Sequence, residues 1–310
     1  LKNFKPIEII NFNQKVVFED AQVETCILSV EKTRHLSLVT VGQDVDFKYT
    51  FNPETWLDDD NFIINFSKSL DIQSVLKKIN SSPEKFNDIL DISNGCKPYQ
   101  AGYGKNFYGQ PLTKQDVENR IYHSKAKESD TFYPELKGKN IKPYTISKPE
   151  DYINWGDWLM SPKDSHYHFQ PKILIRQIIG KKFICALDKS NAIADQSLYI
   201  AVPYVGSEIS LEFVLGVLNS KLYGYYFRKF YSEEDDLFPK IKVNELKRLP
   251  FKLPESNTQK KIIGLVTQII KEKEFNPAFN SFDIENEIDQ LVYQLYGLTE
   301  EEIKIIEGDS

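Results

Sequence analysis

The spacing of hydrophobic positions in the first 94 residues predicts strands followed by helices. Short apolar, β-branched runs predict strands at 7–12, 16–18, 22–30 and 36–41, with a hairpin joining the second and third of these. An acidic run at 53–62 interrupts this regularity. Apolar residues then recur at helical spacing over 70–79, and Ser82 opens a second short helix that ends near Asp91.

The rest of the chain changes from a β pattern to a helical one. Apolar runs at 173–179 and 183–187 predict a hairpin through Gly180–Lys182, and 196–202 predicts a third strand. From Ser210 onward apolar residues recur every three to four positions, with one helical face over 211–225 and further helices after Thr258 and from about Asp283 to Leu295. The sequence from Thr299 to Glu302 is typical of a capping box that opens a last helix.

This order of patterns predicts an α+β protein with a mixed, β-rich middle and C-terminal helices. We divide the chain into four predicted segments: strands at 1–50, a helical linker at 51–94, a β-rich domain at 95–256 and a helical segment at 257–310. Because the chain begins with Leu1 in what the pattern predicts as structure, we expect it to be part of a longer protein.

Composition narrows the class of protein. Of the residues, 41% are hydrophobic and 27% charged, which is ordinary for a globular protein. No apolar run approaches the roughly twenty residues of a membrane span, and no signal peptide precedes the first strands, so we expect a cytoplasmic protein. Three widely separated cysteines, Cys26, Cys96 and Cys185, indicate neither a disulfide framework nor a zinc cluster, and we predict that they are buried thiols.

Charge is unevenly distributed. The chain carries a net charge of −6. Residues 95–182, however, contain 15 basic and 9 acidic side chains and carry +6, whereas both flanking segments are acidic. A one-sided positive charge of this kind is typical of a surface that faces phosphates.

The loop from Gly95 to Gly109, GCKPYQAGYGKNFYG, lies in this basic segment. Its glycines match neither the GxxxxGK[ST] nor the GxGxxG phosphate-binding pattern, so a catalytic nucleotide loop is disfavoured. Glycine, lysine and tyrosine together suit close approach to a nucleic acid, phosphate contact and base stacking. An ordinary surface turn rich in glycine and tyrosine explains the loop equally well.

Two short motifs carry a weaker catalytic signal. Glu135-Leu136-Lys137 contains the ExK element of metal-dependent nucleases, but this element is common by chance. His166 and His168 stand on alternate positions without a third ligand nearby, so core or solvent-facing histidines are favoured over a metal pair. The residues alone therefore indicate a recognition module, with no catalytic residue and no metal site assigned.

Several segments, in order, resemble the TaqI-like C-terminal specificity domain, which is the target-recognition part of adenine-N6 DNA methyltransferases and of type IIG (formerly IIS) restriction-modification enzymes. The segments are VVFEDAQVETCILSVEK (16–32), ILDISNGCKPYQAG (89–102), ELKGKNIKPYTI (135–146), PKILIRQI, LEFVLGVLNSKLYGYYF, LFPKIKVNELKRLPF and IDQLVYQLYGLTEEEIKIIE. The first of these is similar to the last strand hairpin of the methyltransferase domain that precedes the recognition domain.

The resemblance implies what the chain does and what surrounds it. The parent would be a restriction-modification enzyme with an S-adenosylmethionine-dependent methyltransferase upstream, with or without a nuclease and Mg²⁺, and double-stranded DNA would be the partner. The cofactor-binding FxGxG and catalytic [DN]PPY motifs are missing here, so we expect this chain to hold no cofactor and to be inactive alone. In the parent, the methyltransferase would flip an adenine out of the duplex while this module selects which adenine.

Residue type and loop position give candidate DNA contacts. For phosphates we predict the following lysines: Lys97, Lys105, Lys139, Lys142, Lys181 and Lys182. For bases or grooves we predict these residues: Tyr99, Gln100, Tyr144, Arg176 and Gln177. Arg176 and Gln177 are neighbours on a predicted strand and point to opposite faces, so at most one is expected to face DNA.

Two alternatives stay open at this point. The helices after 257 could dock a partner subunit, which would make the chain a protein-interaction module with an incidental basic middle. The parent could also belong to a phage-defence methyltransferase system that needs other subunits.

Overall fold

The structure, a computed structural model, describes residues 4–12, 17–18, 25–33, 38–44, 47–51, 53, 70–231, 240–254 and 256–308. The chain divides into two compact units, Leu1–Asn80 and Ser81–Ser310, and each is described by itself.

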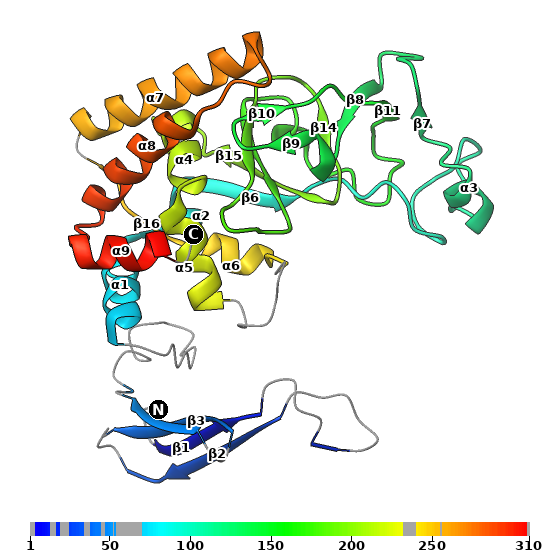
Figure 1. The fold of residues 1–310 in the computed structure, drawn as a ribbon. Helices are drawn as coiled ribbons and strands as arrows, with labels where there is room; N and C mark the ends of the chain where they lie inside the picture. The colour runs from blue at the N-terminus through cyan, green and yellow to red at the C-terminus, as the bar shows by residue number, and fades with distance from the viewer. Residues whose placement is uncertain are drawn as a thin grey trace. The chain divides into compact units, whose positions relative to one another are not determined.

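The N-terminal unit contains a small sheet and a helix (Figure 1). Its elements are β1 (Lys5–Asn11), β2 (Cys26–Glu31), β3 (Val39–Asp44), β4 (Phe47–Phe51) and α1 (Leu70–Asn80). The strand order is β2-β1-β3-β4; β1 is antiparallel to β2 and parallel to β3. The sequence pattern missed β4, and residues 19–24 of the predicted hairpin lie outside the described residues.

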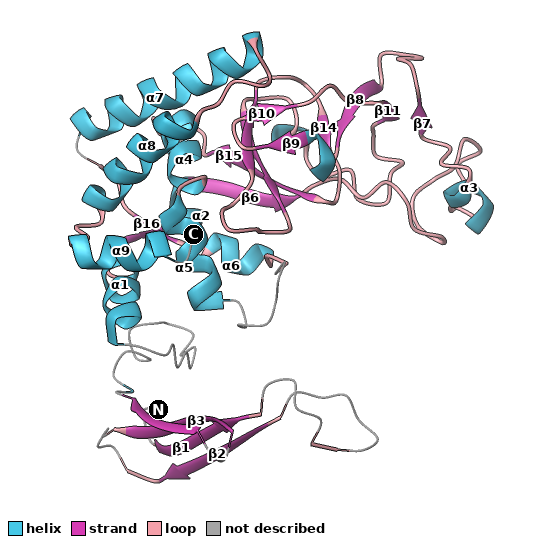
Figure 2. Cartoon of the chain, in the orientation of Figure 1, coloured by secondary structure: helices cyan, strands magenta, loops and turns pink. Residues whose placement is uncertain are grey.

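The second unit mixes short strands and helices, as the sequence predicted (Figure 2). Its strands are β5 (Glu84–Lys85), β6 (Leu90–Asn94), β7 (His123–Ser124), β8 (Phe132–Leu136), β9 (Ile141–Lys142), β10 (Thr145–Ile146), β11 (Asp151–Asn154), β12 (Lys172–Arg176), β13 (Cys185–Asp188), β14 (Ile193–Ala194), β15 (Leu198–Pro203) and β16 (Pro250–Phe251). Its helices are α2 (Phe86–Ile89), α3 (Lys114–Glu118), α4 (Leu211–Leu218), α5 (Lys221–Tyr231), α6 (Val243–Lys247), α7 (Ser256–Phe275), α8 (Phe282–Leu295) and α9 (Glu300–Gly308), with 3₁₀ turns η2 (Gly138–Asn140) and η3 (Ser165–Tyr167).

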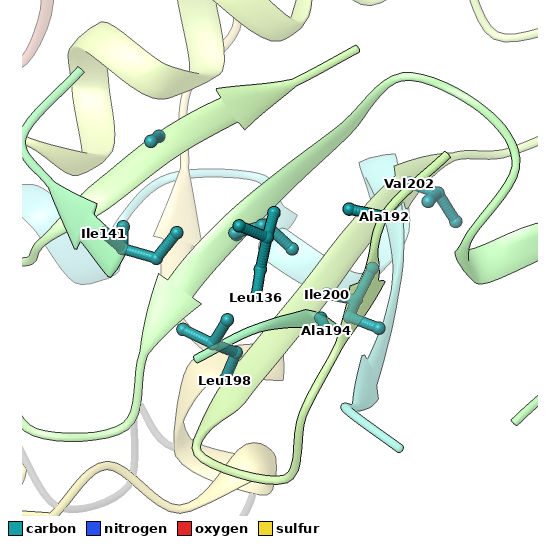
Figure 3. Packing of buried hydrophobic residues seen from close by; sticks show 9 residues of the cluster. Leu136, Ile141, Ala192, Ala194, Leu198, Ile200 and Val202 are labelled. Carbon is teal, nitrogen blue, oxygen red and sulfur yellow. The ribbon is translucent and has the colours of Figure 1, made fainter. Parts of the chain in front are cut away.

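A central sheet in the order β13-β12-β15-β6 carries much of the core of this unit. The predicted hairpin forms as β12 and β13, with Ile173 opposite Leu187, and the predicted third strand forms as β15. Strands β12 and β15 are buried at nearly every position because both of their faces are covered. One face packs Leu136, Ile141, Ala192, Ala194, Leu198, Ile200 and Val202 into a buried cluster (Figure 3).

A second sheet, in the order β14-β8-β11-β7, supports the loop that follows β6. Buried residues beneath that loop form a separate cluster: Cys96, Leu112, Tyr122, Ile153, Leu159 and Ile193. Half-buried Trp155 and Trp158 pack against this cluster, so the two tryptophans are packing residues. This second core fixes the backbone of the 95–112 segment from below.

The C-terminal helices pack onto the central sheet through α4. The apolar stretch predicted as one helical face over 211–225 divides into α4 and α5. At the division, the Asn219 side chain accepts a hydrogen bond from Cys185 N–H and donates one to Cys185 O, both at 3.0 Å. The predicted capping box at α9 is present, because Thr299 N–H donates to Glu302 and Glu302 N–H donates to Thr299. No helix among the described residues is both long and apolar enough to span a bilayer.

The boundary between the compact units falls at 80/81, inside the segment 51–94 that we predicted as a linker. The last part of that segment forms β6, which pairs with β15 in the central sheet, Ile92 opposite Ala201. The functional division into four segments stays a prediction.

The three cysteines differ in their environment. Cys96 and Cys185 are buried as predicted, whereas the prediction is wrong for Cys26, which is exposed because it lies on the edge strand β2. Burial raises the pKa of Cys96 to about 12 and that of Cys185 well above its usual value. We therefore expect a thiol-specific reagent at pH 8 to modify only Cys26 rapidly in the native chain, since the thiolate is the reactive form, and to modify all three cysteines in denaturant. Rapid native labelling of Cys185 would contradict this burial.

Candidate nucleic-acid interface

An open depression of about 350 Å³ lies where β6 and β12 end and β15 begins. It is lined by Asn94, Gly95, Lys97, Met160, Ser161, Lys163, Gln177, Gln196, Tyr199 and Lys240. These residues come from segments far apart in the sequence: the end of β6, the 160–163 segment, the end of β12, the turn before β15, and the start of the segment that leads to α6.

Backbone hydrogen bonds hold these segments together. Gly95 N–H donates to Leu198 O at 2.9 Å, and Lys97 exchanges backbone hydrogen bonds with Ser161 at 2.9 and 3.0 Å. Across the depression, Ile241 N–H donates to Gln177 O at 2.8 Å, which brings Lys240 alongside β12. The walls of the depression are thus fixed by main-chain contacts.

Glycine at position 95 is required by this close approach. A Cβ atom at Gly95 would lie 2.0 Å from Asp195 O, which is inside any allowed contact. The glycine therefore lets the end of β6 pass against the turn before β15. Its presence in the sequence reflects packing of the wall of the depression and not a phosphate cradle.

The lining is rich in positive charge and amide groups. Lys97, Lys163 and Lys240 are its charged residues, and no acidic side chain belongs to this set. The Lys97 ammonium donates to Gln100 Oε1 at 2.9 Å, a neutral partner that leaves its charge uncompensated. The Tyr199 hydroxyl donates to Ile241 O at 2.6 Å, so it is already engaged in holding the wall. Gln177, Gln196 and Asn94 supply amides that can donate and accept hydrogen bonds.

Some of the predicted contact residues meet here and others do not. Lys97 and Gln177 both line the depression, and Gln100 holds Lys97. Arg176, the last residue of β12, is not part of the lining, and by the alternation of a strand its side chain lies on the same face as Leu174 of the buried cluster.

The other predicted lysines lie away from the depression. Lys105, Lys142 and Lys181 are exposed. Lys139 is exposed too and is paired with Glu150 at 2.7 Å. Lys182 is half-buried between Glu285 at 3.4 Å and Asp289 at 3.6 Å, so its charge is already compensated.

Both predicted tyrosines are packed against other residues of the chain. The Tyr99 hydroxyl lies 2.7 Å from His123 Nδ1 and accepts the Tyr122 N–H at 2.8 Å, while its ring stacks on Tyr122 with centroids 5.1 Å apart. Tyr144 is 3% exposed, so its ring lies in the core. In this conformation Tyr144 offers no surface to a ligand, and a DNA contact by Tyr144 would require a rearrangement of the core.

Sequence reasoning missed Lys163, Lys240, Gln196 and Asn94. Lys163 follows Pro162 in a loop, where its φ is 64°, and Lys240 joins the site through a bridge with Ile178. The basic character of 95–182 could have drawn attention to Lys163. No local pattern indicates Lys240, because its place depends on a contact 62 positions away in the sequence.

The ExK motif forms a buried charge network instead of an open centre. The Glu135 side chain is 2% exposed and lies 2.9 Å from both His123 Nε2 and Lys137 Nζ. Lys137 continues to Asp151 at 2.7 Å. Burial alone would raise the pKa of Glu135, but the hydrogen bonds and charges of His123 and Lys137 outweigh it and hold that pKa below its usual value.

The paired histidines are likewise structural. His166 Nε2 lies 3.2 Å from Asp91, and His168 is buried with Nε2 3.0 Å from Pro162 O. Burial lowers the pKa of His168 to about 4, so the ring is neutral at pH 7. Within the described ranges, no group of three His, Cys, Asp or Glu side chains is arranged to hold a metal ion.

Comparisons with known proteins agree with this architecture. Over 295 residues the chain is 26% identical to a Methanocaldococcus jannaschii protein named as a type II restriction enzyme and methyltransferase, RM.MjaORFECS2P, covering 90% of this chain and 24% of that protein. The chain thus spans about a quarter of the length of this relative. Its fold is similar to that of the type IIL restriction-modification enzyme MmeI, solved in complex with DNA, with a TM-score of 0.54 and 11% identity over 98% of this chain and 45% of the other.

A third comparison concerns the β-rich region. Residues 133–251 match the family of TaqI-like C-terminal specificity domains. This range includes most of the central sheet and most of the lining of the depression, with only the wall formed by 94–97 lying outside it. This match agrees with the resemblance that the ordered segments of the sequence indicated.

Proposed function

We propose that this chain is the sequence-specific DNA recognition module of a restriction-modification enzyme, and that it positions duplex DNA for adenine-N6 methylation. The observation that carries the proposal is the depression, where three lysines and three amide side chains converge without an acidic neighbour in the lining. The match of residues 133–251 to a family of specificity domains supports the same conclusion.

The chemistry of the lining suits two tasks. Lys97, Lys163 and Lys240 would meet backbone phosphates, which sets the register of the duplex without reading its sequence. Gln177 and Gln196 would reach base edges, because a glutamine amide can donate to and accept from adenine in the major groove. The rigid walls would keep the two sets of contacts in fixed relation.

The catalytic steps belong to other parts of the proposed parent. S-adenosylmethionine would be bound by a methyltransferase domain of the same polypeptide, and a nuclease with Mg²⁺ would be a further part where one is present. No residue of this chain is assigned to either cofactor. Function in phage defence and a cytoplasmic location stay predictions.

Two measurements test the proposal. Selection from a random duplex library with the 310-residue chain should enrich one short sequence. Expression of the full reading frame in a host without adenine methylation should place methyladenine in that same sequence across the genome. Failure of the folded chain to bind any duplex at low salt would overturn the proposal and favour a protein-interaction module.

Gln177 and Arg176 provide a matched pair for testing base readout. We expect Gln177→Ala to relax the base preference at one position of the selected sequence by about 1–3 kcal/mol, because the lost amide no longer pairs with a base edge. Arg176→Ala, at the last position of β12 and outside the lining of the depression, should leave the preferred sequence unchanged. Competition binding with single-base variants of the selected duplex measures both. A change of sequence preference in the Arg176 variant alone would place the base contact outside the depression.

A further inference from the structure

Exposed aromatic side chains lie at the tip of the loop that follows Lys97. Tyr103, Phe107 and Tyr108 are 57%, 68% and 88% exposed, respectively. Exposed Lys105 stands between them in the sequence. Large aromatic side chains that are left in water so close together are seldom needed for folding, and they mark a surface that meets a ligand.

The loop that carries these rings is held firmly. Asn106 accepts hydrogen bonds through its side-chain oxygen from Tyr108 N–H at 3.0 Å and Gln110 N–H at 3.1 Å. Its backbone exchanges two more, since Asn106 N–H donates to Gln110 O and Gly109 N–H donates to Asn106 O. Gly109 supplies the φ of +76° that closes this turn. The rings are therefore presented on a preorganised support, which lowers the entropic cost of binding.

The base of the loop is fixed to the same core as the depression. Lys105 N–H donates to Trp158 O at 2.8 Å, and Lys105 O accepts the Tyr122 hydroxyl at 2.6 Å. A Cβ atom at Gly104 would lie 2.7 Å from Trp158 O, so the glycine allows this approach. The same 158–163 segment pairs with Lys97 through Ser161 and contributes Lys163 to the lining. One wall of the depression and the aromatic tip are therefore held by the same backbone segment.

We propose that the tip formed by residues 103–109 is an aromatic wedge that stacks on bases of the bound duplex, with Tyr108 as its leading ring. This inference rests on the proposed function and adds a contact of a different kind. The depression would hold phosphates and base edges, whereas the wedge would press an aromatic face against the base stack. Lys105, between the rings, would meet the phosphate next to the stacked step. Partial unstacking by an inserted side chain is a recurrent way in which proteins kink DNA.

Tyr108 is the best position for a substitution that tests stacking, because its ring is almost fully exposed and makes no ring contact with the described residues. Phe107, in contrast, lies edge-on to Tyr122 with centroids 6.4 Å apart, so its replacement would also disturb the core. Phe275 provides the control, since it is 92% exposed at the end of α7, and α7 lies apart from α3, the helix that follows the aromatic loop (Figure 1).

The test uses the 310-residue chain and the selected duplex, with 2-aminopurine replacing one adenine at a time. We expect Tyr108→Ala to weaken binding between about fivefold and about 150-fold, as for the loss of one base–aromatic stack. The salt slope should stay unchanged, because a tyrosine releases no counterions. Tyr108→Phe should bind as the wild type does, and so should Phe275→Ala. A rise in 2-aminopurine fluorescence at one or two positions with the wild type, lost with Tyr108→Ala, would locate the unstacked step.

The outcomes separate this inference from the proposed function. Wild-type binding with an unaltered affinity of Tyr108→Ala overturns the wedge and leaves DNA recognition intact. Loss of affinity in Tyr108→Phe as well would assign the effect to the hydroxyl group and overturn stacking. An absence of DNA binding by the wild-type chain overturns both.

Discussion

Replacing Glu135 with alanine is expected to lower the free energy of unfolding by about 3–5 kcal/mol, because it removes one partner from a buried charge network. His123 and Lys137 both lie 2.9 Å from the Glu135 carboxylate, and the His123 side chain is only 7% exposed. Without the carboxylate, Lys137 keeps only Asp151 as an acidic partner, and the buried His123 ring loses the partner of its Nε2 atom while Nδ1 keeps Tyr99. Chemical denaturation at pH 7 measures the loss. Glu118→Ala, which removes an exposed carboxylate on α3, should stay within about 0.5 kcal/mol of the wild type.

Lowering the pH should reproduce part of this loss of unfolding free energy in the wild-type chain. The pKa of Glu135 lies below its usual value, and so does that of Asp151, which Lys125 and Lys137 hold through hydrogen bonds. A carboxyl group with a lowered pKa in the folded state contributes stability above its unfolded pKa, and that stability is lost as the pH falls through the folded pKa. We therefore expect the unfolding free energy to fall from about pH 4 downward, and to fall less steeply in Glu135→Gln, which has lost one of the two titrating groups. Equal stability of Glu135→Ala and the wild type at pH 7 would show that the network contributes little.

The Glu135 variants also bear on the ExK motif. A nuclease lysine and glutamate must reach a metal ion and a water molecule, but Glu135 is enclosed and bound on both sides. Loss of folding stability together with any loss of function in Glu135→Ala is what a structural network predicts. A variant that stays stable and abolishes cleavage in the parent would restore the catalytic interpretation.

Local sequence patterns predicted the parts of the fold that depend on interactions between residues close together in the sequence. The β-branched runs around Gly180 formed β12 and β13, because both strands pair with their sequence neighbours. Thr299 and Glu302 formed their capping box because its hydrogen bonds span three residues. The apolar residues Ile262, Val266 and Ile269 of α7 are buried as their helical spacing indicates.

The candidate site depends on contacts that no local pattern encodes. β6 pairs with β15 across more than a hundred residues, and this pairing brings Asn94 and Lys97 to the depression. Tyr144 and Lys182 have the residue types of a DNA surface, but the core encloses the first and Glu285 and Asp289 pair with the second. Residue type thus identified what could contact DNA, whereas burial and pairing between distant segments decide which side chains are available.

The largest effect on DNA binding is expected from replacing Lys97, Lys163 and Lys240 together with alanine. Each neutralised phosphate changes the slope of log affinity against log salt by about 0.9, which corresponds to about fivefold in affinity at about 0.15 M salt relative to 1 M. The triple variant should therefore bind the selected duplex about 100-fold more weakly, with a salt slope smaller by about three. Titrations at several salt concentrations give both quantities. The base preference should stay the same, because phosphate contacts carry no sequence information.

A second triple variant separates the depression from the overall charge of the protein. Lys260, Lys261 and Lys271 are exposed on α7. Their replacement with alanine removes the same number of positive charges, three, from a chain whose net charge is −6. If the depression holds the phosphates, the α7 variant should keep the wild-type salt slope and lose little affinity, since exposed charges farther from the DNA than the Debye length of about 8 Å are screened. Equal losses in the two variants would instead assign the affinity to a diffuse field, and the depression would then no longer explain how the duplex is held in register.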